Sequence, residues 1–429
     1  MDKYSRRTFI SNSLKGAAGL LAVSIVPFGI SKFYNRSEEN TKNFEKNTMY
    51  SDLIPLPIPI LLKNKSSVPN EAEFDLTVQM SKKNFIKGKE TNTLGYNGDY
   101  PGPVIRVKKG DKVSIKIKNN INEDTTVHWH GLQVDGENDV GPHNRIKSGG
   151  NWNPGFTINQ PAATLWYHPH PHLLHKAGEQ VYKGLAGLFY IDDDISDSLP
   201  IPKKYGVNDI PLIIEDKKLD SNGKFEYKLG MHDVMMSLQG GTILVNGTIN
   251  PYLEVPSGKM SFRLLNGSNA RFYEFLFSDN QRFYQIASDG GFLEKPVEMT
   301  KLILSPGERA EIIVDFSEYK KGDVVELTDQ GTEFMKFVVT EEIQETFDIP
   351  DELAQIERID PSKSFKTRSF VFQGMCSNVN INGKQMDMDR IDEYLDLNTT
   401  EIWEISNESS GKMGGMAHPF HAHGTVLNI

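Results

Sequence analysis

The sequence predicts an all-β protein of tandem Greek-key sandwiches, and three observations support this prediction. The 429 residues include 36 glycines and 22 prolines, a composition that favours short strands and turns over long helices. Alternating apolar stretches recur between clusters of turn residues, as is typical of strands with one buried face in antiparallel sandwiches. The third observation is an internal repeat, in which the same turn and the same strand occur three times.

The first 36 residues are predicted to be an export signal. The segment SRRTFI at 5–10 is a twin-arginine signature, and the apolar stretch 16–30 that follows it contains Pro27 and is short for a membrane span. No A-x-A cleavage site follows, so retention of the leader as an anchor stays open. Polar residues 37–51 are expected to form a flexible tether. We therefore expect export by the twin-arginine machinery to the cell envelope, periplasmic or extracellular.

Three related domains are expected after the tether. Each repeat has an Asn-Gly turn, then an alternating strand that ends in asparagine: the turns are Asn97-Gly98, Asn246-Gly247 and Asn382-Gly383, and the strands end at Asn119, Asn266 and Asn407. We place the first domain at 52–195, the second at 205–345 and the third at 365–429. The first two repeats run about 70 residues beyond their asparagines, whereas the sequence ends sooner after Asn407. The third sandwich is therefore expected to be incomplete, with biological truncation and a gene-model artefact both left open.

Six of the 11 histidines form three His-x-His pairs, His128/His130, His168/His170 and His421/His423. On an extended strand the side chains of residues i and i+2 point the same way, so two imidazoles can meet one metal ion or two neighbouring ions. Imidazole suits copper, zinc, iron and nickel, and among divalent ions Cu²⁺ binds nitrogen sites most tightly. One such pair is weak evidence, but three pairs beside aromatic residues and glycines indicate a metal centre. The stretch after Asn266 has no histidine, so the second domain is expected to be a spacer without copper.

Charge and cysteine content exclude other classes of function. The net charge is −10 although the leader is basic, which argues against nucleic acid or an anionic membrane surface as a partner. The single cysteine, Cys376, excludes an intramolecular disulfide framework and a multi-cysteine metal site within this sequence.

The motifs HWHG at 128–131, WYHPHPH at 166–172 and HPFHAHG at 418–424 resemble three of the four copper signatures of the multicopper oxidases, in the family's order. The resemblance is to three-domain bacterial copper-efflux and laccase-like oxidases, and it covers residues 52–429. It implies cupredoxin-like sandwiches, a trinuclear copper cluster between the first and third domains, and a type 1 copper in the third. On matching positions it implies type 2 ligands at His128 and His421, type 3 ligands at His130, His168, His170 and His423, and a type 1 ligand at His418.

The function implied by this resemblance is an oxidase. One-electron oxidation of Cu(I) or of a small phenolic reductant at the type 1 copper would feed the cluster, which would reduce O₂ to water. Asp139 matches a family acid that aids proton delivery, and it is therefore the candidate catalytic residue; its reading as a simple turn aspartate stays open. Since three repeats lie in one chain, we expect a monomer rather than a trimer of two-domain units.

Methionines and further histidines leave several alternatives open. Met413 and Met416 precede His418 and would suit a Cu(I) substrate site, because thioethers select Cu(I), but methionine is also a common core residue. His172 and His175 follow the second pair, either as residues near the metal or as solvated loop residues.

The sequence departs from the family in one respect. The fourth signature, a His-Cys-His segment, does not occur among these residues. Blue copper needs two histidines and a thiolate, so the type 1 site is in doubt and activity is expected to be impaired. The alternative is a non-catalytic copper-binding or cell-envelope structural protein on the same fold, as in some relatives that act in cell division; the six retained cluster histidines disfavour it.

Overall fold

The all-β prediction is confirmed in the computed structural model, which describes residues 54–139, 145–170, 174–228, 230, 233, 237–341, 346–374, 378–387, 389–408 and 417–425, without the side chains of 174–176. Within these ranges the helices are short: α2 (Leu174–Tyr182), α3 (Asp194–Ser198) and the 3₁₀ turn η1 (Pro361–Lys363). No helix in the described ranges is long and apolar enough to cross a membrane. The predicted leader and tether lie outside the described residues.

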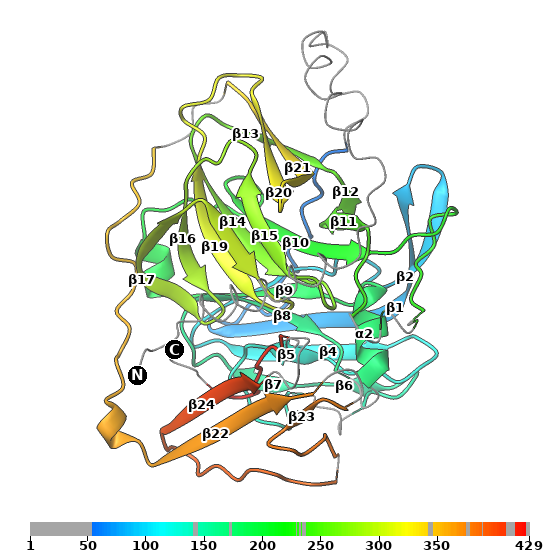
Figure 1. The fold of residues 1–429 in the computed structure, drawn as a ribbon, viewed down its shortest axis with the longest axis vertical. Helices are drawn as coiled ribbons and strands as arrows, with labels where there is room; N and C mark the ends of the chain where they lie inside the picture. The colour runs from blue at the N-terminus through cyan, green and yellow to red at the C-terminus, as the bar shows by residue number, and fades with distance from the viewer. Residues whose placement is uncertain are drawn as a thin grey trace, which may run out of the picture. The chain divides into compact units, whose positions relative to one another are not determined.

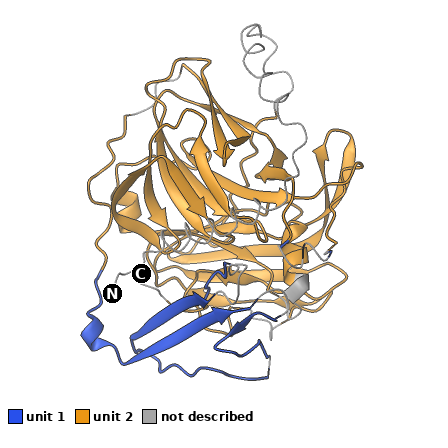
Figure 2. Ribbon diagram, viewed as in Figure 1, with its two compact units in different colours: residues 1–52, 230–237, 357–421 blue, residues 53–229, 238–356, 422–429 orange. Residues whose placement is uncertain are grey.

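The chain divides into two compact units, which are described one at a time (Figure 2). Unit 1 comprises residues 1–52, 230–237 and 357–421, and unit 2 comprises residues 53–229, 238–356 and 422–429. Unit 2 holds four β-sheets, arranged as two sandwiches, and unit 1 holds one sheet (Figure 1).

The first sandwich of unit 2 carries most of the histidines. Its five-stranded sheet contains β1 (Glu71–Ile86), β2 (Lys89–Tyr96), β4 (Lys112–Asn119), β6 (Asn151–Trp152) and β7 (Gly155–Thr157). Its four-stranded sheet has the order β3 (Ile105–Lys108), β9 (Gly187–Asp192), β8 (Ala163–His168) and β5 (His128–His130). Alternate residues of β4 point inward, so Val113, Ile115 and Ile117 meet Trp129 and Tyr167 from the opposite sheet in one core.

The second sandwich follows along the chain. Its seven-stranded sheet contains β10 (Asp209–Lys217), β11 (Thr242–Val245), β12 (Thr248–Ile249), β14 (Lys259–Asn266), β16 (Phe283–Ser288), β17 (Gly291–Met299) and β19 (Arg309–Asp315). Its five-stranded sheet contains β13 (Tyr252–Val255), β15 (Tyr273–Phe277), β18 (Lys301–Leu304), β20 (Val324–Asp329) and β21 (Thr332–Val339). The prediction of one buried face is wrong for β14. Its inward residues, among them Phe262, fill the sandwich core, and Leu265 on the other face packs with Trp166 of the first sandwich.

Unit 1 contains a three-stranded sheet of β22 (Lys366–Gln373), β23 (Asn380–Ile381) and β24 (Glu401–Glu408). The predicted third alternating strand is present as β24. Apolar side chains of this sheet remain exposed, with Ile402 at 38% and Ile405 at 44% of their full accessibility. Phe370, Trp403 and Phe420 form an aromatic cluster within the unit.

The three Asn-Gly turns have the same local structure. Asn97, Asn246 and Asn382 have φ of 56°, 48° and 53°, and the glycine that follows each also has positive φ. Two consecutive positive φ values define a turn that favours Asn-Gly, because asparagine and glycine tolerate the left-handed region. Each asparagine Oδ1 accepts from a backbone N–H of β1, β10 or β22, respectively. Each Nδ2 donates to the carbonyl of the residue two positions before that N–H on the same strand.

Each strand that ends a repeat has one parallel partner, which corrects the antiparallel prediction for that pair, whereas β4 and β14 also pair antiparallel on their other side. β4 lies parallel to β1, β14 to β10 and β24 to β22. In the first sandwich the chain leaves β2, crosses to the opposite sheet as β3 and returns as β4 beside β1. Because of this crossing, β4 runs in the same direction as β1, whereas strands joined by a simple hairpin run in opposite directions. The turn pattern in the sequence does not reveal the crossing.

Candidate metal centre

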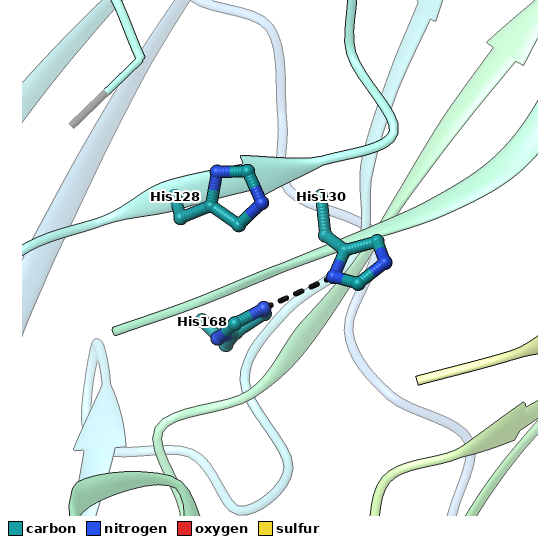
Figure 3. A group of neighbouring side chains, drawn as sticks. All are labelled: His128, His130 and His168. Carbon is teal, nitrogen blue, oxygen red and sulfur yellow. Dashed lines mark hydrogen bonds between the residues drawn. The ribbon is translucent and has the colours of Figure 1, made fainter. Parts of the chain in front are cut away.

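Strands β5 and β8 bring the first two His-x-His pairs together. They pair in antiparallel register, with His128 opposite His168 and His130 opposite Trp166. The side chains of His128, His130 and His168 converge in front of these strands (Figure 3). One ligand atom from each of the three rings lies within 4.8 Å of the others. The alternation predicted for HWH is thus what brings two imidazoles of one strand to the same site.

The separation of His130 and His168 suits a shared metal ion. His130 Nδ1 and His168 Nε2 are 3.2 Å apart and lie within hydrogen-bond distance (Figure 3). Imidazole nitrogens bind a metal ion at about 2 Å, so two nitrogens on one ion are about 3 Å apart. His168 Nδ1 donates to the carbonyl of Pro169 at 2.9 Å, which directs Nε2 toward His130. The Trp166 ring stacks on His168, with centroids 4.0 Å apart.

Asp139 connects His128 to a further histidine, His423. Its Oδ1 accepts from His128 Nδ1 at 2.8 Å and from the backbone N–H of Trp129 at 3.1 Å. Its Oδ2 pairs with His423 Nδ1 at 3.1 Å. The rings of His128 and His423 are stacked, with centroids 3.8 Å apart. A carboxylate bonded to Nδ1 holds the proton there and leaves Nε2 as the ligating nitrogen, which is a common arrangement at metal sites.

Burial and these hydrogen bonds determine the protonation states. Burial lowers the pKa of His128 to about 4, and the Asp139 hydrogen bond only partly opposes this effect. Burial alone would raise the pKa of Asp139, but the hydrogen bonds from His128 and His423 outweigh it and hold that pKa well below its usual range. At neutral pH the His128 imidazole is therefore neutral and the Asp139 carboxylate is ionised. A neutral imidazole is the form that binds a metal.

His170 adds a fourth imidazole ring, and one of its nitrogens has no hydrogen-bond partner. Its backbone N–H donates to Thr126 Oγ1 at 2.5 Å, which fixes the segment after β8 to the segment before β5. The ring lies 5.5 Å from that of His423 and 5.9 Å from that of His128. Its buried Nδ1 has no hydrogen-bond partner. Because a buried polar atom without a partner is costly, this nitrogen fits a metal ligand.

Sequence reasoning missed two polar residues that support these histidines. Thr126 is fully buried, and the hydroxyl of Thr125 beside it donates to Gln180 Oε1 of α2 at 2.8 Å. Gln180 also donates to the carbonyl of Asp124 at 3.0 Å. The signal available in the sequence was the pair of threonines just before VHWH.

His418 lies in unit 1, as does His421, whereas His423 belongs to unit 2. Asn407, the asparagine that ends β24, bonds His418 Nδ1 through its Oδ1 at 2.8 Å. His418 Nε2 is buried without a partner, so it too fits a metal ligand. The predictions on Cys376, Met413, Met416, His172 and the side chain of His175 lie outside the described residues.

The fold and the site define a protein of tandem β-sandwiches with a partly buried histidine cluster that can hold a metal ion through nitrogen atoms. Comparisons with known proteins agree with this class. A profile described as multicopper oxidase matches residues 77–196, and a second with the same description matches residues 355–429. The multicopper oxidase mco of Staphylococcus aureus is 42% identical over 374 residues, which cover 87% of this chain and 79% of that protein.

Two further similarities bear on function. The cell division protein FtsP of Escherichia coli K12 is 42% identical over 274 residues, covering 64% of this chain and 56% of that protein. The crystal structure of a laccase from Pediococcus acidilactici Pa5930 matches with a TM-score of 0.81 at 38% identity, covering 87% of this chain and 80% of that one. This chain belongs to the multicopper oxidase family, whose members are oxidoreductases that use copper. The sequence-based recognition of the family and of copper as the cofactor is therefore confirmed.

Proposed function

We propose that this chain is an exported oxidase that couples one-electron oxidation of Cu(I) or a small phenol to four-electron reduction of O₂ to water. The observation that carries the proposal is the convergence of His128, His130 and His168, with one ligand atom from each ring inside 4.8 Å. Bound copper would accept electrons one at a time and deliver them to O₂. The similarity to a laccase supports the phenolic substrate, and the Met413/Met416 pair in the sequence supports Cu(I).

We infer the ligand set from the family motifs, and the geometry within unit 2 supports the part of the set that lies there. The proposed type 2 ligands are His128 and His421, the proposed type 3 ligands are His130, His168, His170 and His423, and the proposed type 1 ligand is His418. Asp139 supports this set, because its two oxygens hold the Nδ1 protons of two of these histidines. A proton that reaches either oxygen is one hydrogen bond from a ligand ring, which supports Asp139 as the residue that delivers protons.

We further propose that a polypeptide of residues 1–429 by itself turns over slowly. Among these residues the type 1 candidate is His418 without a Cys-His partner segment. Electrons would then have to enter directly at a buried centre, since His128 is only 1% exposed. Partial copper occupancy and weak blue absorption are expected, whereas four bound coppers with strong blue absorption would contradict this inference.

The remaining assignments are proposals of the same kind. We propose domains at 52–195, 205–345 and 365–429, preceded by a twin-arginine signal at 1–36, and a monomer in the cell envelope. Replacing Arg6 and Arg7 together by lysine tests the route of export. The protein is expected to stay in the cytoplasmic fraction after this change, and unchanged export would refute the signal.

Oxygen consumption by the copper-loaded full chain tests the proposed function. With Cu(I) or 2,6-dimethoxyphenol as reductant, we expect slow O₂ uptake, and we expect none from a His130→Ala/His168→Ala variant. Equal uptake by both proteins would refute the proposed centre. The reductant that gives the faster uptake identifies the substrate class.

A non-catalytic role in the cell envelope is the second candidate, because FtsP is a cell division protein and is 42% identical over 274 residues. In cells that lack this gene, a division function would be restored equally by the parent chain and by the His130→Ala/His168→Ala variant. Retained copper without O₂ uptake in the parent would also favour this alternative. We favour the oxidase, since a scaffold has no need of the buried histidines.

A further inference from the structure

The described residues of the second sandwich include no histidine, yet one of its turns lies beside His130. This turn, Ser305–Arg309, connects β18 to β19. Gly307 within it has φ of +81°, and a Cβ placed there would lie 3.4 Å from His130 Cε1 and 3.7 Å from Trp166 Cζ2. The edge of the His130 ring therefore lies where it would touch any side chain at position 307, and the turn there has a conformation that favours glycine.

Arg309, the first residue of β19, extends this contact to strand β8. Its side chain is only 3% exposed. Nε donates to the carbonyl of Thr164 at 3.1 Å, and Nη1 donates to the carbonyl of Gly307 at 2.8 Å. Thr164 lies on the same strand as His168. One guanidinium thus holds both the turn that touches His130 and the strand that carries His168.

The same guanidinium lies against the end of β5. Gly131 follows His130 directly and has φ of +96°. A Cβ at Gly131 would lie 2.7 Å from Leu165 Cδ2 and 3.0 Å from Arg309 Nη2, so these two side chains together occupy the space that a larger residue would need. Arg309 is therefore packed against the residue next to His130 as well as bonded to β8.

Asp289 holds the guanidinium in place from the second sandwich. The backbone N–H of Arg309 donates to Asp289 Oδ1 at 2.7 Å, and Nη1 pairs with the same oxygen at 3.0 Å. Nη2 donates to the carbonyl of Asp289 at 3.0 Å. The planar fork of arginine can satisfy acceptors in several fixed directions at once, which the single ammonium of lysine cannot do.

We propose that Arg309, together with the turn at Gly307, is a positioning residue that fixes His130 relative to His168 and thereby sets copper affinity at this pair. The inference rests on the proposed function, since it takes the pair to be copper ligands. Metal ligands must be held within about 0.5 Å of their working geometry. Loss of a group that orients a ligand typically weakens metal binding about 10–100-fold.

Copper affinity of three full-length variants tests the proposal. Arg309→Met removes the bonds to β8, and Arg309→Lys keeps the charge without the fork. Arg271→Met is the matched control, because Arg271 is a partly buried arginine of the second sandwich whose bonds go to Asp329 and Gly240. Cu(I) affinity is measured by competition with a chelator, and unfolding of the metal-free proteins is measured alongside. We expect about 10–100-fold weaker Cu(I) binding in Arg309→Met, a smaller loss in Arg309→Lys and no change in Arg271→Met.

The ring ¹⁵N resonances of His130 and His168 in the metal-free proteins give a second measurement. We expect both to shift in Arg309→Met and to stay unchanged in Arg271→Met. Unchanged resonances, or a Cu(I) affinity of Arg309→Met equal to that of Arg271→Met, would overturn the positioning role. If the parent chain binds no Cu(I) at all, the proposed function fails by itself, and the resonances alone then decide whether Arg309 positions the two rings.

Discussion

Replacing Asp139 by asparagine should expose how the carboxylate organises the histidines. The carboxylate accepts three hydrogen bonds, from His128, from His423 and from the backbone of Trp129. An amide oxygen in the place of Oδ1 can still accept from His128 and Trp129, but an amide NH₂ in the place of Oδ2 would meet the Nδ1 proton of His423. His423 must then move its proton to the nitrogen that would bind metal, or the contact must break.

The expected loss of stability follows from the hydrogen bond between His423 and the carboxylate, which the asparagine cannot make. A hydrogen bond to a charged group contributes about 1.5–3 kcal/mol, so the metal-free protein should lose about that much stability. At roughly 2–4 °C per kcal/mol for a domain of this size, the melting temperature should fall by about 3–12 °C. Copper affinity should fall about 10–100-fold because the ligand tautomer changes.

Thermal unfolding and copper titration of Asp139→Asn, beside Glu137→Gln, provide the assay. Glu137 is an exposed acid in the same turn, so its replacement makes the same change of charge without touching a histidine. The reasoning would be refuted if the two variants had the same melting temperature and the same copper affinity.

Three further predictions follow from buried groups. Burial lowers the pKa of His128 to about 4, so as the pH falls this ring is protonated in the unfolded chain before it is protonated in the folded protein. The free energy of unfolding of the metal-free protein should therefore be highest above about pH 6.5 and fall by about 3 kcal/mol toward pH 4. A free energy of unfolding in urea that does not change over this pH range would contradict the prediction. Arg263→Met, which leaves the carboxylates of Asp209 and Glu311 buried, should cost about 3–5 kcal/mol in chemical unfolding. Gly187→Ala, whose methyl would strike the Tyr167 ring, should cost about 1–3 kcal/mol, with Gly136→Ala in open space as the neutral control.

The sequence was most informative where the signal was local. The HWH alternation places the His128 and His130 rings on one face of β5, with centroids 5.5 Å apart. The Asn-Gly turns could be recognised because two consecutive positive φ values restrict the choice of residues. In both cases the chemistry and the geometry come from residues that are neighbours in the chain.

Contacts between sandwiches could not be predicted in this way. The burial of β14 on both faces depends on Leu265 joining a hydrophobic cluster with residues of the other sandwich, among them Trp166, and the alternation of β14 gives no sign of it. Arg309 resembles an ordinary charged residue at the start of a strand, yet it is bonded to the carbonyl of Thr164. Such contacts depend on how two sheets dock, which the periodicity of a single strand does not encode.

Copper analysis tests whether His130 and His168 bind the metal. The full chain and its His130→Ala/His168→Ala variant are dialysed against the same low concentration of copper, and bound metal is then measured by mass spectrometry. We expect the parent to retain copper that the variant does not, with His–copper scattering in the X-ray absorption spectrum of the parent only. Equal copper in both proteins would contradict the assignment of this centre.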